Sequence, residues 1–257
     1  MIHGKFGDGN LRSDFWRKWQ GKVVRSLKIR GGAGTILLAI AFCKSLLVKQ
    51  CIRCLTRNPW NPWYQFLDRR YDRRFGVDTA GIDFIPAVLS LCESANVYSP
   101  TTRSTFVHVM RRLDIDHSRF VFIDFGCGKG KTLLLAAESP FKRVIGIEIS
   151  PRLARIAEEN IKSYNGKRAC AEIGVVCTDA TGYVSPREPA VYYLYDPFKR
   201  DVMAVVLENI QRSLVESPRE IYIVYLEPSW QSLLDGAAFL VPVKQTSRYC
   251  IYRARGA

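Results

Sequence analysis

The order of apolar and polar positions between residues 119 and 161 predicts a strand, a helix and a second strand. Phe120 to Phe125 is a run of β-branched and aromatic residues, interrupted only by Asp124. A helical stretch, residues 131–137, follows a glycine-rich turn and ends before the Ser-Pro pair at residues 139–140. Val144 to Ile149 is a second apolar run. Such a strand-helix-strand unit pairs its strands in parallel, almost always with a right-handed crossover.

The turn between the first strand and the helix has glycine at every second position, Gly126, Gly128 and Gly130. Glycine permits a positive φ, and because it lacks a Cβ atom a small molecule can lie against the backbone. The helix that starts here presents unpaired N–H groups, which suit an anionic or carboxylate group. Glu148, near the end of the second strand, can accept hydrogen bonds from a ribose diol. The unit therefore predicts a nucleoside-containing cofactor.

The spacing of the glycines separates the cofactor classes that use such a turn. A P-loop has four residues between its first glycine and the Gly-Lys-Thr ending, whereas only three separate Gly126 from Gly130. A dinucleotide-binding turn has its third glycine three positions after the second, where this chain has Lys131. A nucleotide-dependent oxidoreductase is therefore disfavoured, although it stays an alternative.

Asp124, the Gly-x-Gly-x-Gly turn of residues 126–130 and Glu148 together resemble motif I and the following acidic loop of the class I S-adenosylmethionine-dependent methyltransferases. The resemblance covers roughly residues 75–257. It implies an α/β fold, doubly wound, with a mostly parallel seven-stranded sheet and an antiparallel C-terminal hairpin. The segments at residues 75–81 and 98–102 resemble pre-core elements of a group of bacterial methyltransferases of unassigned substrate.

The resemblance also implies a set of residues that bind S-adenosylmethionine. These are Asp124, Gly126, Cys127, Gly128 and Gly130 for the methionine part, Glu148 for the ribose, Asp179 for the adenine and Thr101 for the carboxylate. Asp179 follows a third predicted strand, residues 174–177, and an aspartate there is also a common turn former. Thr101 is also consistent with a plain helix N-cap.

The fourth predicted strand, residues 190–195, ends in Asp196, Pro197 and Phe198. This resembles the Asn/Asp-Pro-Pro-aromatic motif of methyltransferases that act on amino nitrogens, with one proline missing. In such a site Asp196 accepts N–H groups of the acceptor so that its lone pair faces the methyl group, and Phe198 packs on the acceptor. A tight turn without catalytic function is the alternative. The resemblance therefore points to a nitrogen acceptor.

Charge is distributed unevenly along the 257 residues. Residues 1–75 hold sixteen Lys and Arg and four acidic residues, a net of +12, whereas residues 76–257 hold twenty-two and twenty, a net of +2. The nearly neutral catalytic part makes a protein amine a better acceptor than a nucleic acid. Because the Pro- and Asn-rich residues 58–63 predict a break in regular structure, we expect a basic extension, residues 1–60, and a methyltransferase domain, residues 61–257, with pre-core helices in residues 61–118.

The extension contains an uncharged run, residues 33–43, that is too short to cross a bilayer. We expect a peripheral membrane contact through residues 12–53, or else a helix packed on the catalytic domain. The eight scattered cysteines predict no disulfide framework, so a cytoplasmic protein is expected. Cys51 and Cys54 form a lone CxxC, and no metal is expected there. A non-catalytic or nucleotide-binding protein of this fold, with a basic arm for nucleic acid or membrane, is the remaining alternative.

Overall fold

The computed structural model describes residues 62–81 and 100–255, which all belong to one compact unit, Pro59–Ala257. The predicted basic extension with its uncharged run, the Cys51–Cys54 pair and residues 82–99 of the expected pre-core region lie outside the described residues.

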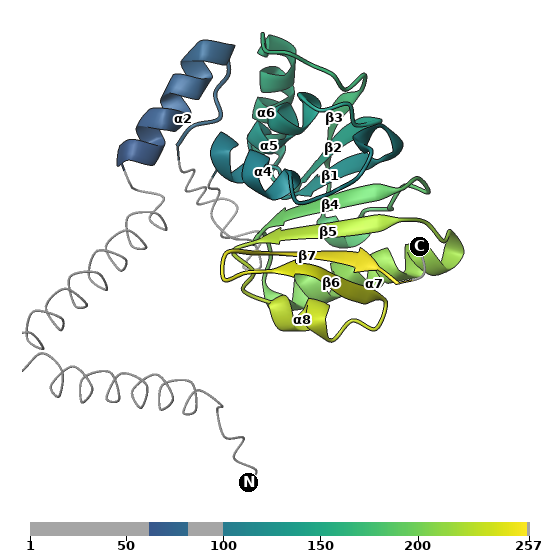
Figure 1. Cartoon of the computed structure of the whole chain (residues 1–257). Helices are drawn as coiled ribbons and strands as arrows, with labels where there is room; N and C mark the ends of the chain where they lie inside the picture. The colour runs from purple at the N-terminus through teal and green to yellow at the C-terminus, as the bar shows by residue number, and fades with distance from the viewer. Residues whose placement is uncertain (1–61, 82–99, 256–257) are drawn as a thin grey trace, which may run out of the picture. The chain divides into compact units, whose positions relative to one another are not determined.

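Helices and strands alternate along the chain, as the hydrophobic pattern predicts (Figure 1). Their bounds are α2 (Pro62–Phe75), α4 (Arg103–Met110), η1 (His117–Arg119), β1 (Val121–Phe125), α5 (Lys131–Ala137), β2 (Arg143–Glu148), α6 (Pro151–Ser163), β3 (Ile173–Cys177), η2 (Ala180–Gly182), β4 (Ala190–Tyr195), α7 (Arg200–Glu216), β5 (Ile221–Leu226), α8 (Gln231–Asp235), β6 (Leu240–Gln245) and β7 (Tyr249–Ala254).

The seven strands form one sheet in the order β3-β2-β1-β4-β5-β7-β6. The first five strands are parallel, and β7 is antiparallel to both of its neighbours, β5 and β6. The last strand of the chain is therefore inserted between β5 and β6. This arrangement confirms the predicted doubly wound sheet with an antiparallel C-terminal hairpin. Because all the parallel strands end at the same edge, the turns that follow β1, β2, β3 and β4 gather there.

Two layers of helices cover the sheet, and the alternation of side chains along β1 shows why. Phe120 and Phe122 belong to a core with α4 and α5, whereas Val121, Ile123 and Phe125 belong to a second core with α7 and α8. Figure 1 shows α4, α5 and α6 on one side of the sheet and α7 on the other. A strand buried on both faces needs a continuous apolar run, which is the pattern found in the sequence.

The structure changes or adds three details relative to the sequence-based expectation. Helix α2 begins at Pro62, inside the predicted break of residues 58–63, because proline is well tolerated in the first turn of a helix, where its missing N–H has no partner to lose. Helix α4 is capped by Thr102, whose hydroxyl accepts a hydrogen bond from the backbone N–H of Thr105. The five-residue helix α8 is too short to produce a periodic pattern and was not expected.

Candidate active site

The turn after β1 takes the backbone conformation that only glycine adopts easily. Gly126, Gly128 and Gly130 have φ values of +76°, +54° and +81°. A Cβ atom on Gly126 would lie 2.8 Å from Cβ of Pro197, and one on Gly130 would lie 3.0 Å from Cβ of Ala157. The glycines are therefore required both by the turn and by the elements packed against it.

Glu148 joins this turn to the turn after β2. Its Oε2 accepts a hydrogen bond from the backbone N–H of Gly128 at 2.9 Å, and its Oε1 accepts one from Ser150 at 2.9 Å. Burial raises the pKa of Glu148, and these backbone hydrogen bonds oppose the rise. Each carboxylate oxygen retains acceptor capacity, so Glu148 can also accept hydrogen bonds from a ribose diol.

Asp124 is a buried carboxyl group at the end of β1, with only 3% of its surface exposed. Burial raises its pKa to about 8, the nearby charge of Glu148 adds to the rise, and a hydrogen bond with Thr132 opposes it. Within residues 62–81 and 100–255 no basic side chain forms an ion pair with Asp124. A buried carboxyl group beside a glycine turn, without a cation of its own, suits the ammonium group of the methionine part of S-adenosylmethionine.

The raised pKa of Asp124 predicts a pH dependence of stability. Between pH 3.8 and about 8 the unfolded chain ionises Asp124 while the folded chain keeps it protonated, so the wild type loses stability as pH rises through this range. Relative to Asp124→Asn, its free energy of unfolding should fall by at most about 1.4 kcal/mol per pH unit and level off above about pH 8. Denaturant unfolding of both proteins across this range measures the difference, and a constant difference would contradict the assignment.

Thr101 lies beside the same site. It is almost fully buried, and its Oγ1 is 3.2 Å from the phenolic oxygen of Tyr193. Tyr193 is the register partner of Asp124 in the neighbouring strand, so Thr101 contacts a side chain from the strand beside Asp124. The alternative that Thr101 is the helix N-cap is wrong, because Thr102 fills that position. A role for Thr101 toward the cofactor stays a prediction.

The side chain of Cys127 points into the protein interior. The thiol is 4% exposed, and a Cβ atom on Gly146 would lie 2.6 Å from its Sγ. Burial raises the pKa of this thiol well above its ordinary value. If Cys127 contacts a cofactor, it therefore does so through its backbone and not through its thiol.

Asp179 follows β3 and is exposed. Its Oδ1 accepts hydrogen bonds from the backbone N–H and the hydroxyl of Thr181, both at 2.8 Å, and thereby caps η2. The turn-forming function of this aspartate is observed. Its contact with adenine stays a prediction.

The turn after β4 packs directly on the glycine turn. Asp196 has a φ of +41°, and its Oδ1 and Oδ2 accept hydrogen bonds from the hydroxyls of Tyr225, at 2.7 Å, and Ser229, at 2.6 Å. Pro197 lies against Gly126, and the ring of Phe198 meets the ring of Phe125 with centroids 6.1 Å apart. A positive φ in a non-glycine residue is strained and often marks a functional site. The structure thus brings the Asp196 turn and the glycine turn together.

Residues 62–81 contact the glycine turn and the helix that follows it, which the sequence analysis did not predict. Lys129 donates hydrogen bonds from Nζ to Asp78 Oδ1, at 3.4 Å, and to the carbonyl of Ala80, at 3.2 Å. The buried Lys131 pairs with Asp68 of α2. The one available signal was the position of Asp68 on the apolar face of α2. When that face is buried, the acid is buried with it and requires a cation partner.

In the part of the chain that the structure describes, no three His, Cys, Asp or Glu side chains converge to hold a metal ion. No helix of residues 62–81 and 100–255 has the length and apolarity needed to cross a membrane.

Comparison with known proteins gives one family match. The family described as "Histone methylation protein DOT1" matches residues 91–181, about a third of the chain, from the segment before α4 to η2. No curated protein matches the sequence significantly.

Solved structures similar to the chain include several methyltransferases. A precorrin-6y C5,15-methyltransferase from Geobacter metallireducens is 13% identical over 62% of this chain and 90% of its own, with a TM-score of 0.44. A putative methyltransferase from Escherichia coli is 14% identical over 63% and 92%, with a TM-score of 0.44. An RNA methyltransferase from Salinibacter ruber in complex with S-adenosyl-L-homocysteine is 19% identical over 60% and 92%, with a TM-score of 0.36.

The sheet order, the glycine turn with its two buried acids and the family match together define the class. The chain is a class I S-adenosylmethionine-dependent methyltransferase. Its cofactor is S-adenosylmethionine, which the residues at the carboxyl edge of the sheet fit.

Proposed function

We propose that this enzyme transfers the methyl group of S-adenosylmethionine to a nitrogen atom, and that the acceptor is an amine of a protein. The observation that supports a nitrogen acceptor is the Asp196 turn, which presents a fixed carboxylate next to the glycine turn. A neutral amine carries N–H groups that a carboxylate can hold and a lone pair that must point at the methyl carbon. The Asn/Asp-Pro-aromatic resemblance leads to the same acceptor.

The cofactor supplies a methyl group already activated on a sulfonium sulfur. In the proposal, Asp124 holds its ammonium group, Thr101 its carboxylate, Glu148 its ribose and Asp179 its adenine, while the three glycines let the backbone lie against it. Asp196 orients the amine by accepting its N–H groups, which leaves the lone pair free to attack. The C–N bond forms as the C–S bond breaks, the electron pair stays on sulfur, and the amine proton passes to solvent or to Asp196.

The choice of a protein acceptor has two supports. The matching family is described as a histone methylation protein, and residues 76–257 have a net charge of only +2. A nucleic-acid reader usually presents a basic face around its site. A nucleobase in a duplex would also have to be flipped out of its stack before it could reach Asp196.

Radiolabelled methyl transfer tests the acceptor chemistry. The full chain and labelled S-adenosylmethionine are incubated with a cell lysate, which is then separated into protein and RNA. We expect label in protein that survives mild base, because an N-methyl group is stable there whereas a carboxyl methyl ester is hydrolysed. Acid hydrolysis and chromatography then identify the methylated residue. Label that appears in RNA, or that base releases as methanol, would contradict the proposal.

A further inference from the structure

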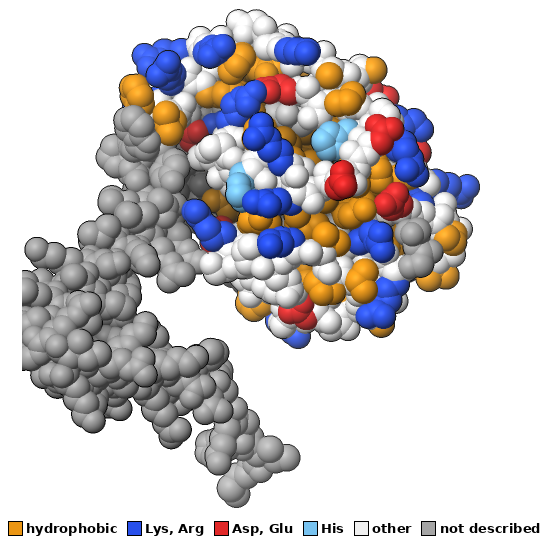
Figure 2. Space-filling view, viewed as in Figure 1, with side chains coloured by type: hydrophobic (Ala, Val, Ile, Leu, Met, Phe, Trp, Pro, Cys, Tyr) orange, Lys and Arg blue, Asp and Glu red, His pale blue; other side chains and the backbone are white. Residues whose placement is uncertain are grey.

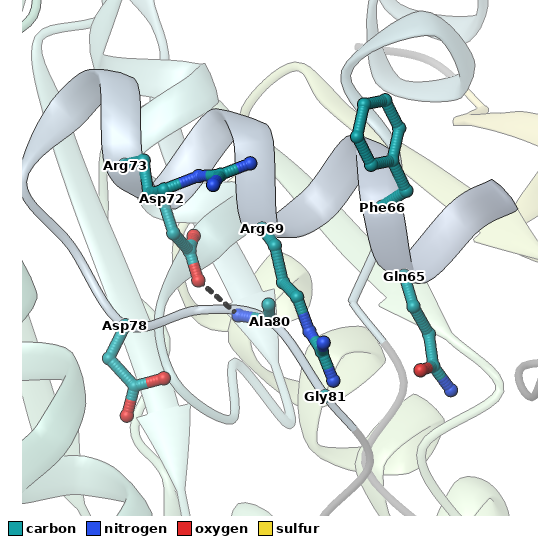
Figure 3. Close-up of a pocket in the computed structure, with 8 residues that line it drawn as sticks. All are labelled: Gln65, Phe66, Arg69, Asp72, Arg73, Asp78, Ala80 and Gly81. Carbon is teal, nitrogen blue, oxygen red and sulfur yellow. Dashed lines mark hydrogen bonds between the residues drawn. The ribbon is translucent and has the colours of Figure 1, made fainter. Parts of the chain in front are cut away.

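A groove lies between α2 and the segment that follows it (Figure 3). Its volume is about 750 Å³, within the range of ligand pockets. Among the described residues it is lined by Gln65, Phe66, Arg69, Asp72, Arg73, Asp78, Ala80 and Gly81. Figure 3 shows Arg69 extending from α2 toward Gly81.

Both acids that line the groove have partners within the protein. Asp72 accepts hydrogen bonds from the backbone N–H groups of Thr79, at 2.8 Å, and Ala80, at 2.6 Å, and from the hydroxyl of Thr79, at 2.6 Å. Asp78 is paired with Lys129. Among the described residues, neither acid therefore forms an ion pair with Arg69 or Arg73.

The two arginines of the groove lie four residues apart, on one face of α2. Arg69 and Arg73 are exposed, and neither forms an ion pair within residues 62–81 and 100–255. Arg70 and Arg74 are also exposed on α2 but do not line the groove. The space-filling view shows basic side chains at the surface over α2 (Figure 2). The groove thus presents two guanidinium groups that can bind an anion.

The floor of the groove is fixed to the cofactor turn. Lys129, inside the glycine turn, donates to the carbonyl of Ala80. Asn160 of α6 donates from Nδ2 to the carbonyls of Asp78, at 2.8 Å, and Lys129, at 2.9 Å, and accepts the N–H of Asp78 on Oδ1 at 2.7 Å. A ligand in the groove is therefore separated from the glycine turn by a single segment of backbone, residues 78–81.

We propose that this groove binds an acidic segment of the acceptor protein, with Arg69 and Arg73 holding Asp or Glu side chains of that segment. The inference rests on the proposed protein acceptor. A guanidinium group donates two parallel hydrogen bonds to a carboxylate, and two arginines four residues apart can hold two carboxylates of a peptide. The groove recognises the acceptor beside the cofactor turn, and Asp196 then receives its amine.

An acidic peptide suits the groove better than a nucleic-acid strand does. A nucleic-acid strand carries a phosphate at every nucleotide and needs a continuous basic surface. Residues 76–257 have a net charge of only +2, so little positive charge lies beyond the groove along which a strand could continue. A short peptide with two acidic side chains does not require such a surface.

The test compares two probes of similar charge, a labelled oligoglutamate and a labelled oligouridine, on the full chain. Fluorescence anisotropy is measured for the wild type, for Arg69→Glu with Arg73→Glu, and for the control Arg70→Glu with Arg74→Glu. The control makes the same change of charge on the same helix. We expect the groove variant to bind oligoglutamate about tenfold more weakly than the control does.

A second readout is independent of any binding by residues 1–60. Arginines of the wild type are modified with a dicarbonyl reagent, with and without oligoglutamate, and each site is quantified by mass spectrometry. We expect oligoglutamate to protect Arg69 and Arg73 but not Arg70 and Arg74. Equal protection of all four, equal affinity of the two variants, or protection by oligouridine alone would overturn the proposal.

Neither readout depends on methyl transfer. If the labelled methyl group appears in RNA while Arg69 and Arg73 are still protected by oligoglutamate, the protein acceptor is wrong and the groove remains an acidic-peptide site. If the label appears in protein and the arginines are not protected, the groove assignment is wrong and the acceptor stands.

Discussion

Gly126→Ala is expected to weaken S-adenosylmethionine binding by about a hundredfold. The reason is twofold, because Gly126 has a φ of +76° and a Cβ atom there would lie 2.8 Å from Cβ of Pro197. The side chain of Pro197 is a rigid ring, so this clash can be removed only if the backbone of one of the two turns shifts. The glycine turn would then no longer match the methionine part of the cofactor. Isothermal titration of both proteins with S-adenosylmethionine measures the loss.

Gly174→Ala in β3 is the matched control for this substitution. Nothing lies within 4 Å of a Cβ atom built on Gly174, and its φ is not in the positive range. The same added methyl group should therefore leave cofactor affinity within about twofold of the wild type and should slightly stabilise the strand. Thermal unfolding confirms that both variants are folded. Equal affinities for Gly126→Ala and the wild type would show that the turn does not contact the cofactor.

Asp196→Gly is expected to lower kcat by about a hundredfold while S-adenosylmethionine affinity changes by less than about threefold. Glycine keeps the positive φ of Asp196, so the variant removes the carboxylate without straining the turn. Asp196→Asn also tolerates this φ and retains one acceptor oxygen, so its kcat should lie between those of Asp196→Gly and the wild type. Steady-state methyl transfer to the labelled protein fraction, together with titration of the cofactor, separates the two effects.

Glu227→Gly is the control for Asp196→Gly. Glu227 directly follows the neighbouring strand β5, also has a positive φ, +45°, and also carries a carboxylate. Its replacement should leave kcat within about threefold of the wild type, because the turn that lies against Gly126 is the one that contains Asp196 and Pro197. An equal loss in both variants would assign the effect to the sheet edge in general, and no loss in Asp196→Gly would remove this carboxylate from the mechanism.

Much of the fold could be predicted from local pattern. The apolar runs that became β1, β2, β4 and β5 are continuous because these strands are buried on both faces, and such runs stand out in a sequence. Helix α6 has clear local signals at its start, since Ser150 caps it and Pro151 occupies its first position. The short helix α8 has no periodic pattern, and the start of α2 was missed because the prolines and asparagines of residues 58–63 predicted a break there.

Of the candidate site, the sequence predicted the residues of the glycine turn better than the partners of Asp196. The glycine spacing with Asp124 and Glu148 indicated the cofactor class, because a turn of this kind is a local structure with a fixed number of residues. The function of Asp196 was only a hypothesis in the sequence, and the structure adds its partners, Tyr225 and Ser229, which lie twenty-nine and thirty-three residues further along the chain. No spacing rule joins residues so far apart.

By itself, then, the sequence determined the order of strands and helices, the conformation of the glycine turn and the class of cofactor. Each of these depends on residues close together in the chain, whose conformational preferences and burial periodicity are local properties. Only the tertiary structure decided that Pro197 packs on Gly126, that Lys131 meets Asp68 and that Arg69 and Arg73 face a groove beside the cofactor turn. These contacts join distant segments, and they form only when the sheet brings its strand ends to one edge and α2 packs against that edge.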